Sequence, residues 1–339
     1  MTRTPAGLRR LLALAAAAVT VTTLAACGTT ENATGSDPTA AGSTSSGPIT
    51  VTDDRGETVT LDAPATKVVS LEWGTTEQVV ALGVMPVGVA DVKGYGNWVT
   101  AAELDDSVTD VGTRGEPSLD AIGGLAPDLI VAVTDTAGTT LDQLEQLAPV
   151  IVVAGNDPTD PIGHMEDTTR MIATALGKDA EADQLMDTFQ TSIDTAKSSL
   201  ADAGLDGAPV TVSDGYQEGS AVSLRIFTET SYWGGLLTAM GVTPTWSAEG
   251  DEVYGLAQTD VEGLTALTDP DLRFLYIAND QDGGDVYTGA LADNPVWKGL
   301  PFVEAGNVAR IPDGTWSFGG PLSGAQFAER ATSLLTASA

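Results

Sequence analysis

The chain has 339 residues, 42% of them hydrophobic, with 15 lysines and arginines against 47 aspartates and glutamates. At this length and apolar content we expect a globular chain of about two domains, at roughly 150 residues each. The formal net charge of -32 excludes nucleic acid as a partner, because phosphate binding needs a basic stripe, and a single histidine excludes a metal site built from several imidazoles.

The first thirty residues have the pattern of an export signal. Arg3, Arg9 and Arg10 precede an apolar run over 11–24. At about fourteen residues this run is long enough for the core of a signal peptide, but shorter than the roughly twenty residues that a membrane-spanning helix needs. The Arg9-Arg10 pair leaves open whether export follows the general secretory route or the twin-arginine route.

The end of this signal resembles the lipobox of bacterial lipoproteins. Residues 24–28 read Leu-Ala-Ala-Cys-Gly, and Cys27 is the sole cysteine of the chain. We therefore expect a signal peptide over 1–26, lipidation of Cys27 and a flexible tether over 27–48, rich in Gly, Ser, Thr, Ala and Pro. The protein is expected to hang from its lipid anchor on the extracytoplasmic face of the bacterial cell membrane.

From residue 49 onward, short runs rich in Val and Ile alternate with helical patterns. Continuous apolar runs are typical of strands buried on both faces, and helical patterns at 75–82 and 118–125 link the first of them. The sequence therefore predicts two α/β lobes, over 49–158 and 205–339. The predicted strands lie at 67–71, 86–90, 129–133 and 150–153 in the first lobe, and at 209–212, 223–227, 273–277 and 307–311 in the second.

A helical region over 159–204 separates the two lobes. Within it, Leu185, Met186, Phe189 and Ile193 recur at a spacing that places them on one face of a helix. If 179–202 is one continuous helix, it is about 36 Å long at about 1.5 Å per residue, which is the size of a domain. The sequence predicts a rigid helical strut between the lobes.

A weak internal repeat supports two related lobes. Residues 118–122 lead to a Pro-Asp pair and a buried strand, and residues 260–264 lead to another Pro-Asp pair and another buried strand. Each unit is predicted to be a short helix that bears one acid, Asp120 in the first and Glu262 in the second.

Several segments of the chain carry a family resemblance in their order along the sequence: 69–73, 81–91, 110–119, 127–130, 294–297, 300–306 and 316–323. They resemble the substrate-binding lipoproteins of iron–siderophore and cobalamin uptake transporters. This is the class III type of periplasmic binding protein, and the resemblance implies two Rossmann-like α/β lobes joined by one long α-helix. The Glu72-Trp73 pair and residues 112–117 are most similar to the ferric hydroxamate branch.

The resemblance implies a cleft that grips an intact ferric siderophore with aromatic rings and a cation, without supplying iron ligands. Arg114 matches the arginine that contacts the iron-bound oxygens, and Tyr254 and Trp316 match aromatics of the second lobe. Arg225 is either a second cation or the partner of an acid, and the indoles at 73 and 98 either face the ligand or pack in the core. The candidate ligand-binding residues are Arg114, Trp73, Trp98, Tyr254, Trp316, Phe318 and Arg225.

One stretch departs from the hydroxamate pattern. Residues 134–138 read Thr-Asp-Thr-Ala-Gly, where the resemblance implies an aromatic residue that stacks on the ligand. The scarcity of cations nevertheless favours hydroxamate over catecholate chelates, because a triply anionic complex needs a basic cluster.

The resemblance also implies that an acid on each lobe docks the permease of an ABC transporter, which works with its ATPase. The repeat places Asp120 and Glu262 at these positions, although both could be ordinary solvated carboxylates. We expect a monomeric receptor with no cofactor, no metal site of its own and no catalytic residues. The alternatives are cobalamin or haem binding in the same class, or an exported hydrolase working through His164.

Overall fold

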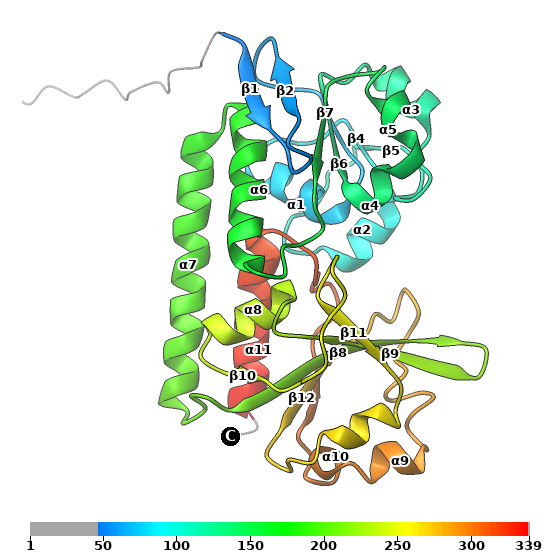
Figure 1. The fold of residues 1–339 in the computed structure, drawn as a ribbon, viewed down its shortest axis with the longest axis vertical. Coiled ribbons are helices and arrows are strands. Elements are labelled where there is room, and N and C mark those ends of the chain that lie inside the picture. Colours follow the sequence, from blue (N-terminus) through cyan, green and yellow to red (C-terminus); the bar gives the residue numbers. More distant parts are fainter. Residues whose placement is uncertain (1–46, 338–339) are drawn as a thin grey trace, which may run out of the picture. The chain divides into compact units, whose positions relative to one another are not determined.

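The computed structural model describes residues 47–337. The predicted signal peptide, Cys27 and residues 27–46 of the predicted tether lie outside the described residues. The described chain contains a two-stranded, a five-stranded and a six-stranded sheet, and long helices lie beside the two larger sheets (Figure 1).

The first lobe is built on a five-stranded parallel sheet of order β5-β4-β3-β6-β7. All five residues of β6 and all four of β7 are buried, as predicted for strands covered on both faces. The strands are β3 (Val68–Ser70), β4 (Gly88–Val89), β5 (Thr109–Asp110), β6 (Leu129–Val133) and β7 (Val150–Val153). The connecting helices are α1 (Trp73–Ala81), α2 (Val92–Trp98), α3 (Leu119–Leu125), α4 (Thr134–Ala137), η1 (Gly138–Thr140) and α5 (Leu141–Leu144).

An antiparallel hairpin precedes this sheet and was not predicted. Strands β1 (Ile49–Thr52) and β2 (Thr58–Leu61) pair in register, and every second side chain is buried. Their apolar residues alternate with threonines instead of forming a continuous run, so a search for strands buried on both faces misses them.

The second lobe contains a mixed sheet of order β11-β9-β8-β12-β13, with β10 on the side of β8. Strands β8 and β9 are antiparallel, because only two residues separate them and a parallel connection needs about a dozen. The strands are β8 (Pro209–Glu218), β9 (Ala221–Phe227), β10 (Thr243–Pro244), β11 (Leu256–Thr259), β12 (Arg273–Ile277) and β13 (Val308–Arg310). The shorter helices of this lobe are α8 (Tyr232–Ala239), η2 (Gly263–Ala266), α9 (Pro295–Lys298) and α10 (Pro301–Glu304).

Three long helices connect and support the lobes. They are α6 (Pro161–Leu176), α7 (Asp179–Asp202) and α11 (Pro321–Ala337). Helix α7 has the predicted bounds: Ala182 near its start belongs to the core of the first lobe, while Phe189 and Leu200 belong to the core of the second. Helix α6 lies beside α7 and also contributes residues to both cores (Figure 1).

The predicted internal repeat holds only in part. Its first unit is the α-helix α3, which begins after Ser118, whose side chain accepts from the backbone N–H of Ala121. Its second unit is a single 3₁₀ turn, η2. Asp260 precedes this turn, and its side chain accepts a hydrogen bond from the backbone N–H of Gly263.

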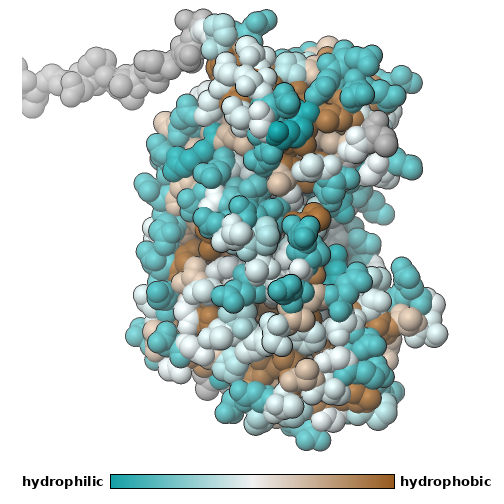
Figure 2. Space-filling view, viewed as in Figure 1, coloured by the Kyte–Doolittle hydropathy of each residue, from teal (hydrophilic) through white to brown (hydrophobic). Residues whose placement is uncertain are grey.

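The visible surface is mainly hydrophilic, with small scattered apolar patches (Figure 2). The exposed large hydrophobic residues of the described chain are Leu147, Tyr216 and Val253. Within residues 47–337, no helix combines the length and apolar character needed to cross a membrane.

Candidate functional site

A cleft of about 650 Å³ lies between the two lobes, within the usual range of small-molecule sites. Its walls include residues that directly follow strands of the first sheet, such as Trp73 after β3 and Asp135 after β6. This position agrees with the rule that open α/β sheets bind ligands at the carboxyl ends of their strands. All seven candidate ligand-binding residues named from the sequence line this cleft.

Arg114 lies over the indole ring of Trp73 in the cleft. Its guanidinium carbon is 3.9 Å from the centroid of that ring, a cation–π distance. Its Nη1 donates to Oε1 of Glu72 across 2.8 Å, and this is its one hydrogen bond to the described residues. The side chain of Arg114 is 34% exposed, so its remaining N–H groups are available to a ligand in the cleft.

Glu72 contacts both members of the Arg114–Trp73 pair. It precedes α1 as its N-cap and also accepts from the backbone N–H of Trp73 at 2.9 Å. Burial raises the pKa of the Glu72 carboxyl, while Arg114 and the Trp73 N–H act in the opposite direction. The sequence analysis did not identify Glu72 as a site residue, although it follows β3 directly, as Trp73 does.

Aromatic rings form a continuous wall of the cleft. Trp316 contacts Trp73 at a centroid distance of 4.9 Å and Phe318 at 5.3 Å, and Phe318 contacts Tyr254 at 4.9 Å. Trp98 lies 6.0 Å from Trp316 at the other end of this row. The contacts are edge-on, the geometry that aromatic pairs prefer.

The two alternatives for the indoles at 73 and 98 have different outcomes. Trp73 is 3% exposed and donates its Nε1 to the carbonyl of Ala90, so it packs in the core and also presents a face to the cleft. Trp98 is half-buried and its Nε1 donates to Oδ2 of Asp282 at 2.8 Å. This hydrogen bond spans the cleft from α2 of the first lobe to the loop after β12.

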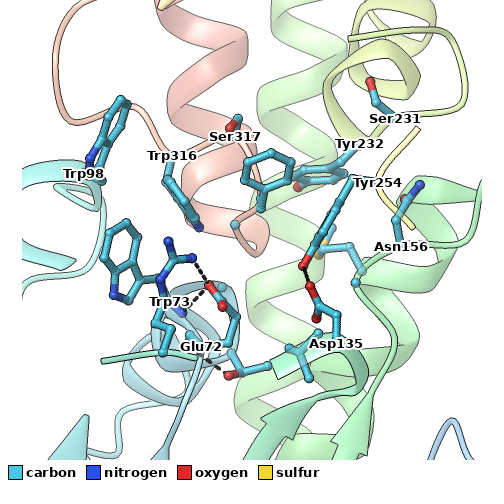
Figure 3. Close-up of a pocket in the computed structure, with 18 of the residues that line it drawn as sticks. Glu72, Trp73, Trp98, Asp135, Asn156, Ser231, Tyr232, Tyr254, Trp316 and Ser317 are labelled. Atoms are coloured by element: carbon cyan, nitrogen blue, oxygen red, sulfur yellow. Dashed lines mark hydrogen bonds and ion pairs between the residues drawn. The ribbon is translucent and has the colours of Figure 1, made fainter. Parts of the chain in front are cut away.

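A second hydrogen bond spans the cleft at Tyr254. Its hydroxyl donates to Oδ2 of Asp135 at 2.8 Å, and the two side chains meet in Figure 3. Burial raises the pKa of the Tyr254 hydroxyl, and the adjacent Asp135 carboxylate adds to this shift, so the hydroxyl remains a donor at neutral pH. Gly155 lies beneath the ring, where a Cβ would be 2.6 Å from Tyr254. Residues 134–138 therefore lack the expected aromatic residue, but their Asp135 positions an aromatic residue of the other lobe, Tyr254.

Arg225 is paired with an acid, the second of its two predicted alternatives. It lies directly opposite Asp214 in the β8–β9 hairpin, and its Nε donates to Asp214 Oδ1 at 2.9 Å while its Nη2 donates to Oδ2. This two-bond geometry is the strong form of a guanidinium–carboxylate contact. Both residues still line the cleft.

The sequence analysis missed several polar residues of the cleft. His164 was considered only as the residue through which a hydrolase would work, but it is half-buried on α6, lines the cleft and has its Nε2 3.0 Å from the carbonyl oxygen of Ala154. Buried polar atoms without a hydrogen-bond partner also belong to residues that line the cleft. They are Oε1 of Gln78, Oγ1 of Thr168, Nε1 of Trp316 and Oγ of Ser317.

A buried carboxylate joins α1 to the start of α11. Glu77 on α1 is fully buried, and it accepts from the N–H groups of Gly320 at 2.9 Å and Ser323 at 2.8 Å, at the start of α11. A carboxylate at this position satisfies orphan donors of the helix and complements its dipole. Burial raises the pKa of Glu77, and the hydrogen bonds from Ser323 and Gly320 oppose that shift.

The two acids expected to dock a permease are both exposed. Asp120 lies in the first turn of α3, and Glu262 immediately precedes η2. Neither forms an ion pair with the residues that the structure describes. Over the same range, the acidic, histidine and cysteine side chains form no group of three or more that could hold a metal ion.

A family model described as periplasmic binding protein matches residues 68–315. Among curated proteins, the chain is 27% identical to the iron(3+)-hydroxamate-binding protein FhuD of Escherichia coli over 261 residues, covering 77% of this chain and 84% of that protein. It is 30% identical to the Fe(3+)-citrate-binding protein YfmC of Bacillus subtilis over 267 residues, covering 78% of each.

A solved structure of similar fold is that of the siderophore-binding protein FhuD from Vibrio cholerae with bound Fe3+–Desferal. The TM-score is 0.70 at 28% identity, and the match covers 81% of this chain and 99% of that one. The petrobactin-binding protein YclQ of Bacillus subtilis has the same fold, with a TM-score of 0.69 at 19% identity, covering 85% of this chain and 98% of that one.

Proposed function

Since this chain belongs to the periplasmic binding protein family, we propose that it is a receptor that binds a ferric siderophore in the interlobe cleft and delivers it to an ABC importer. The family consists of substrate-binding proteins, and relatives named for ferric hydroxamate and ferric citrate match most of the chain. The main support from the site is the position of Arg114, stacked at 3.9 Å on Trp73 with free N–H donors beside a row of aromatic rings.

The chemistry of a ferric hydroxamate suits this arrangement. Its iron is already coordinated by ligand oxygens, so the protein needs donors for those oxygens and apolar faces for the carbon chain, and no iron ligands of its own. A guanidinium can direct two N–H groups toward adjacent oxygens, and the edge-on indole and phenyl rings offer broad apolar contact.

Charge favours hydroxamate over citrate or catecholate. The cleft is lined by two arginines, and each already pairs with a carboxylate, Glu72 in one case and Asp214 in the other. An anionic ferric complex would enter a site with no spare cation, whereas three hydroxamates neutralise Fe³⁺ and leave an uncharged iron centre.

We propose that the receptor is lipid-anchored through Cys27 and that Asp120 and Glu262 dock the permease. The lipoprotein names of relatives such as the putative ABC transporter substrate-binding lipoprotein YhfQ of Bacillus subtilis support the anchor. The exposure of both acids, without an ion pair among the described residues, leaves their carboxylates accessible to cations of a partner.

Titration of the purified soluble form with ferric Desferal, ferric citrate and a ferric catecholate tests the ligand class. Trp73, Trp98 and Trp316 line the cleft, so binding should quench tryptophan fluorescence saturably. We expect the hydroxamate complex to bind most tightly, with no chemical change in the recovered ligand. Tighter binding of citrate or catecholate, or turnover of the ligand, would contradict the proposal.

A further inference from the structure

We propose that the cleft selects a ferric chelate with net positive charge, such as a hydroxamate complex that bears a free ammonium group, and that Asp135 and Asp282 provide its counter-charge. This inference rests on the proposed function, because it specifies which chelate the same site prefers.

The acids of the cleft outnumber its cations. Carboxylates at five positions face two guanidiniums, and the structure places no lysine among the lining residues. Arg114 and Arg225 are each neutralised by one acid, so three carboxylates remain without a cation. The five acids are Glu72, Asp91, Asp135, Asp214 and Asp282.

Asp135 and Asp282 differ from the paired acids in their contacts. Each accepts one hydrogen bond of 2.8 Å from a neutral aromatic donor, Asp135 from Tyr254 and Asp282 from Trp98. Neither forms an ion pair with the described residues, and both are exposed. A neutral donor orients a carboxylate without cancelling its charge, so the negative charge of both acids remains available to a ligand.

The remaining polar groups of the cleft are built for an uncharged partner. Gln78 Oε1, Trp316 Nε1 and Ser317 Oγ have no hydrogen-bond partner, and all three residues are at least nine-tenths buried. A buried polar group without a partner is unfavourable, so these three residues of the cleft favour a ligand that supplies amide or hydroxamate hydrogen bonds.

The neutral polar groups and the unpaired carboxylates of the cleft are suited to different parts of the ligand. Neutral donors and acceptors deep in the cleft would meet the amide and hydroxamate groups around the iron, while the uncompensated carboxylates would attract a pendant cation. Asp135 belongs to the first lobe and Asp282 to the second, so both sides of the cleft contribute negative charge that no protein cation compensates.

A pair of chelates that differ in one charge tests this. Ferric Desferal has a terminal ammonium, and its N-acetylated form is the same hydroxamate complex without that charge. We expect the unmodified protein to bind the amine about tenfold more tightly than the amide, with a preference that weakens when ionic strength rises from about 50 mM to about 300 mM.

The variants are Asp135→Asn, Asp282→Asn and the double change. Asparagine keeps an acceptor oxygen for Tyr254 or Trp98 and removes only the charge. The preference for the amine over the amide should fall in each single variant and be nearly lost in the double variant. Asp187→Asn, an exposed acid on α7 outside the cleft, is the matched control and should leave the preference unchanged.

Equal affinity of the unmodified protein for the two chelates would overturn the inference while leaving siderophore binding intact. The inference would also be overturned if the double variant kept the full preference for the amine over the amide, or if Asp187→Asn lost as much of that preference as the cleft variants. Either result would assign the preference to the overall acidity of the protein. Failure of both chelates to bind would instead overturn the proposed function, and with it this inference.

Discussion

Arg114 is joined to Glu72 by an ion pair of 2.8 Å, and the carboxylate of this pair is the more deeply buried partner. Glu72 therefore fixes the guanidinium over Trp73 before any ligand arrives, and the exposed side of Arg114 keeps its other donors. Such preorganisation lowers the entropy lost when a ligand binds.

We expect Arg114→Ala to weaken binding of ferric Desferal by about 1.5–3 kcal/mol, the scale of a hydrogen bond to a charged group. The measurement is fluorescence titration. The substitution also leaves Glu72 buried without its cation, so the double variant Glu72→Gln/Arg114→Ala is the control that removes this side effect. Affinity equal to that of the unmodified protein in both variants would exclude Arg114 from the site.

We expect Glu77 to make the protein less stable as pH rises. Burial raises the pKa of Glu77 above its ordinary value of 4.5, so the folded state holds the proton more tightly than the unfolded state. The free energy of unfolding then falls as pH rises from about that value through the folded-state pKa. Urea unfolding of the unmodified protein and Glu77→Gln, from acidic to neutral pH, measures this difference.

In Glu77→Gln this part of the pH dependence should disappear, whatever the absolute stability of the variant. Glu304→Gln on α10 is the control, because Glu304 is exposed and its variant should follow the unmodified protein. The free energies of unfolding of Glu77→Gln and the unmodified protein should therefore differ by an amount that changes with pH. A constant difference over this pH range would show that Glu77 does not titrate as expected.

The sequence predicts those parts of the fold that depend on neighbouring residues. Strands β6, β7 and β12 and helix α7 have the predicted bounds, because a continuous apolar run and an apolar stripe at helical spacing are local patterns. Trp73 could also be placed at the sheet edge, because it follows a predicted strand, whereas Arg114 was identified through the family resemblance of residues 112–117.

Contacts between distant segments were not predictable in this way. Asp135 and Tyr254 are 119 residues apart, and Glu77 reaches the start of α11 across 243 residues. With 47 acids in the chain, no spacing indicates which carboxylate meets which donor. The antiparallel β8–β9 hairpin brings Asp214 to Arg225 for the same reason, through pairing that an apolar pattern does not encode.

We expect Asp120→Ala combined with Glu262→Ala to impair uptake of the ferric siderophore without changing its affinity. Both carboxylates are exposed and outside the cleft, so their loss should affect only the contact with the permease. Uptake of radiolabelled iron by cells measures transport, and titration of the purified protein measures binding. Transport at the normal rate in the double variant would contradict the docking role.

We expect Cys27→Ala to release the protein from the membrane or to leave an unprocessed precursor. Lipidation requires the thiol, and this chain has no other cysteine to replace it. Fractionation of cells with detection of the lipid-modified form checks the result, and Cys27→Ser is the conservative companion variant. A mature, membrane-bound Cys27→Ala protein carrying the lipid modification would contradict lipidation at this residue.

We expect Gly74→Ala to destabilise the protein and to weaken ligand binding together. A Cβ at Gly74 would lie 2.3 Å from the carbonyl oxygen of Phe318, so α1 and the segment that carries Trp316 and Phe318 must move apart. Overpacking of this kind costs about 1–3 kcal/mol.

Gly96→Ala on α2 is the control, because nothing lies within 4 Å of its Cβ and alanine favours the helix. Urea unfolding and ferric Desferal titration of both variants measure the effect, and a Gly74→Ala protein as stable as Gly96→Ala would show that the aromatic wall does not depend on this close approach.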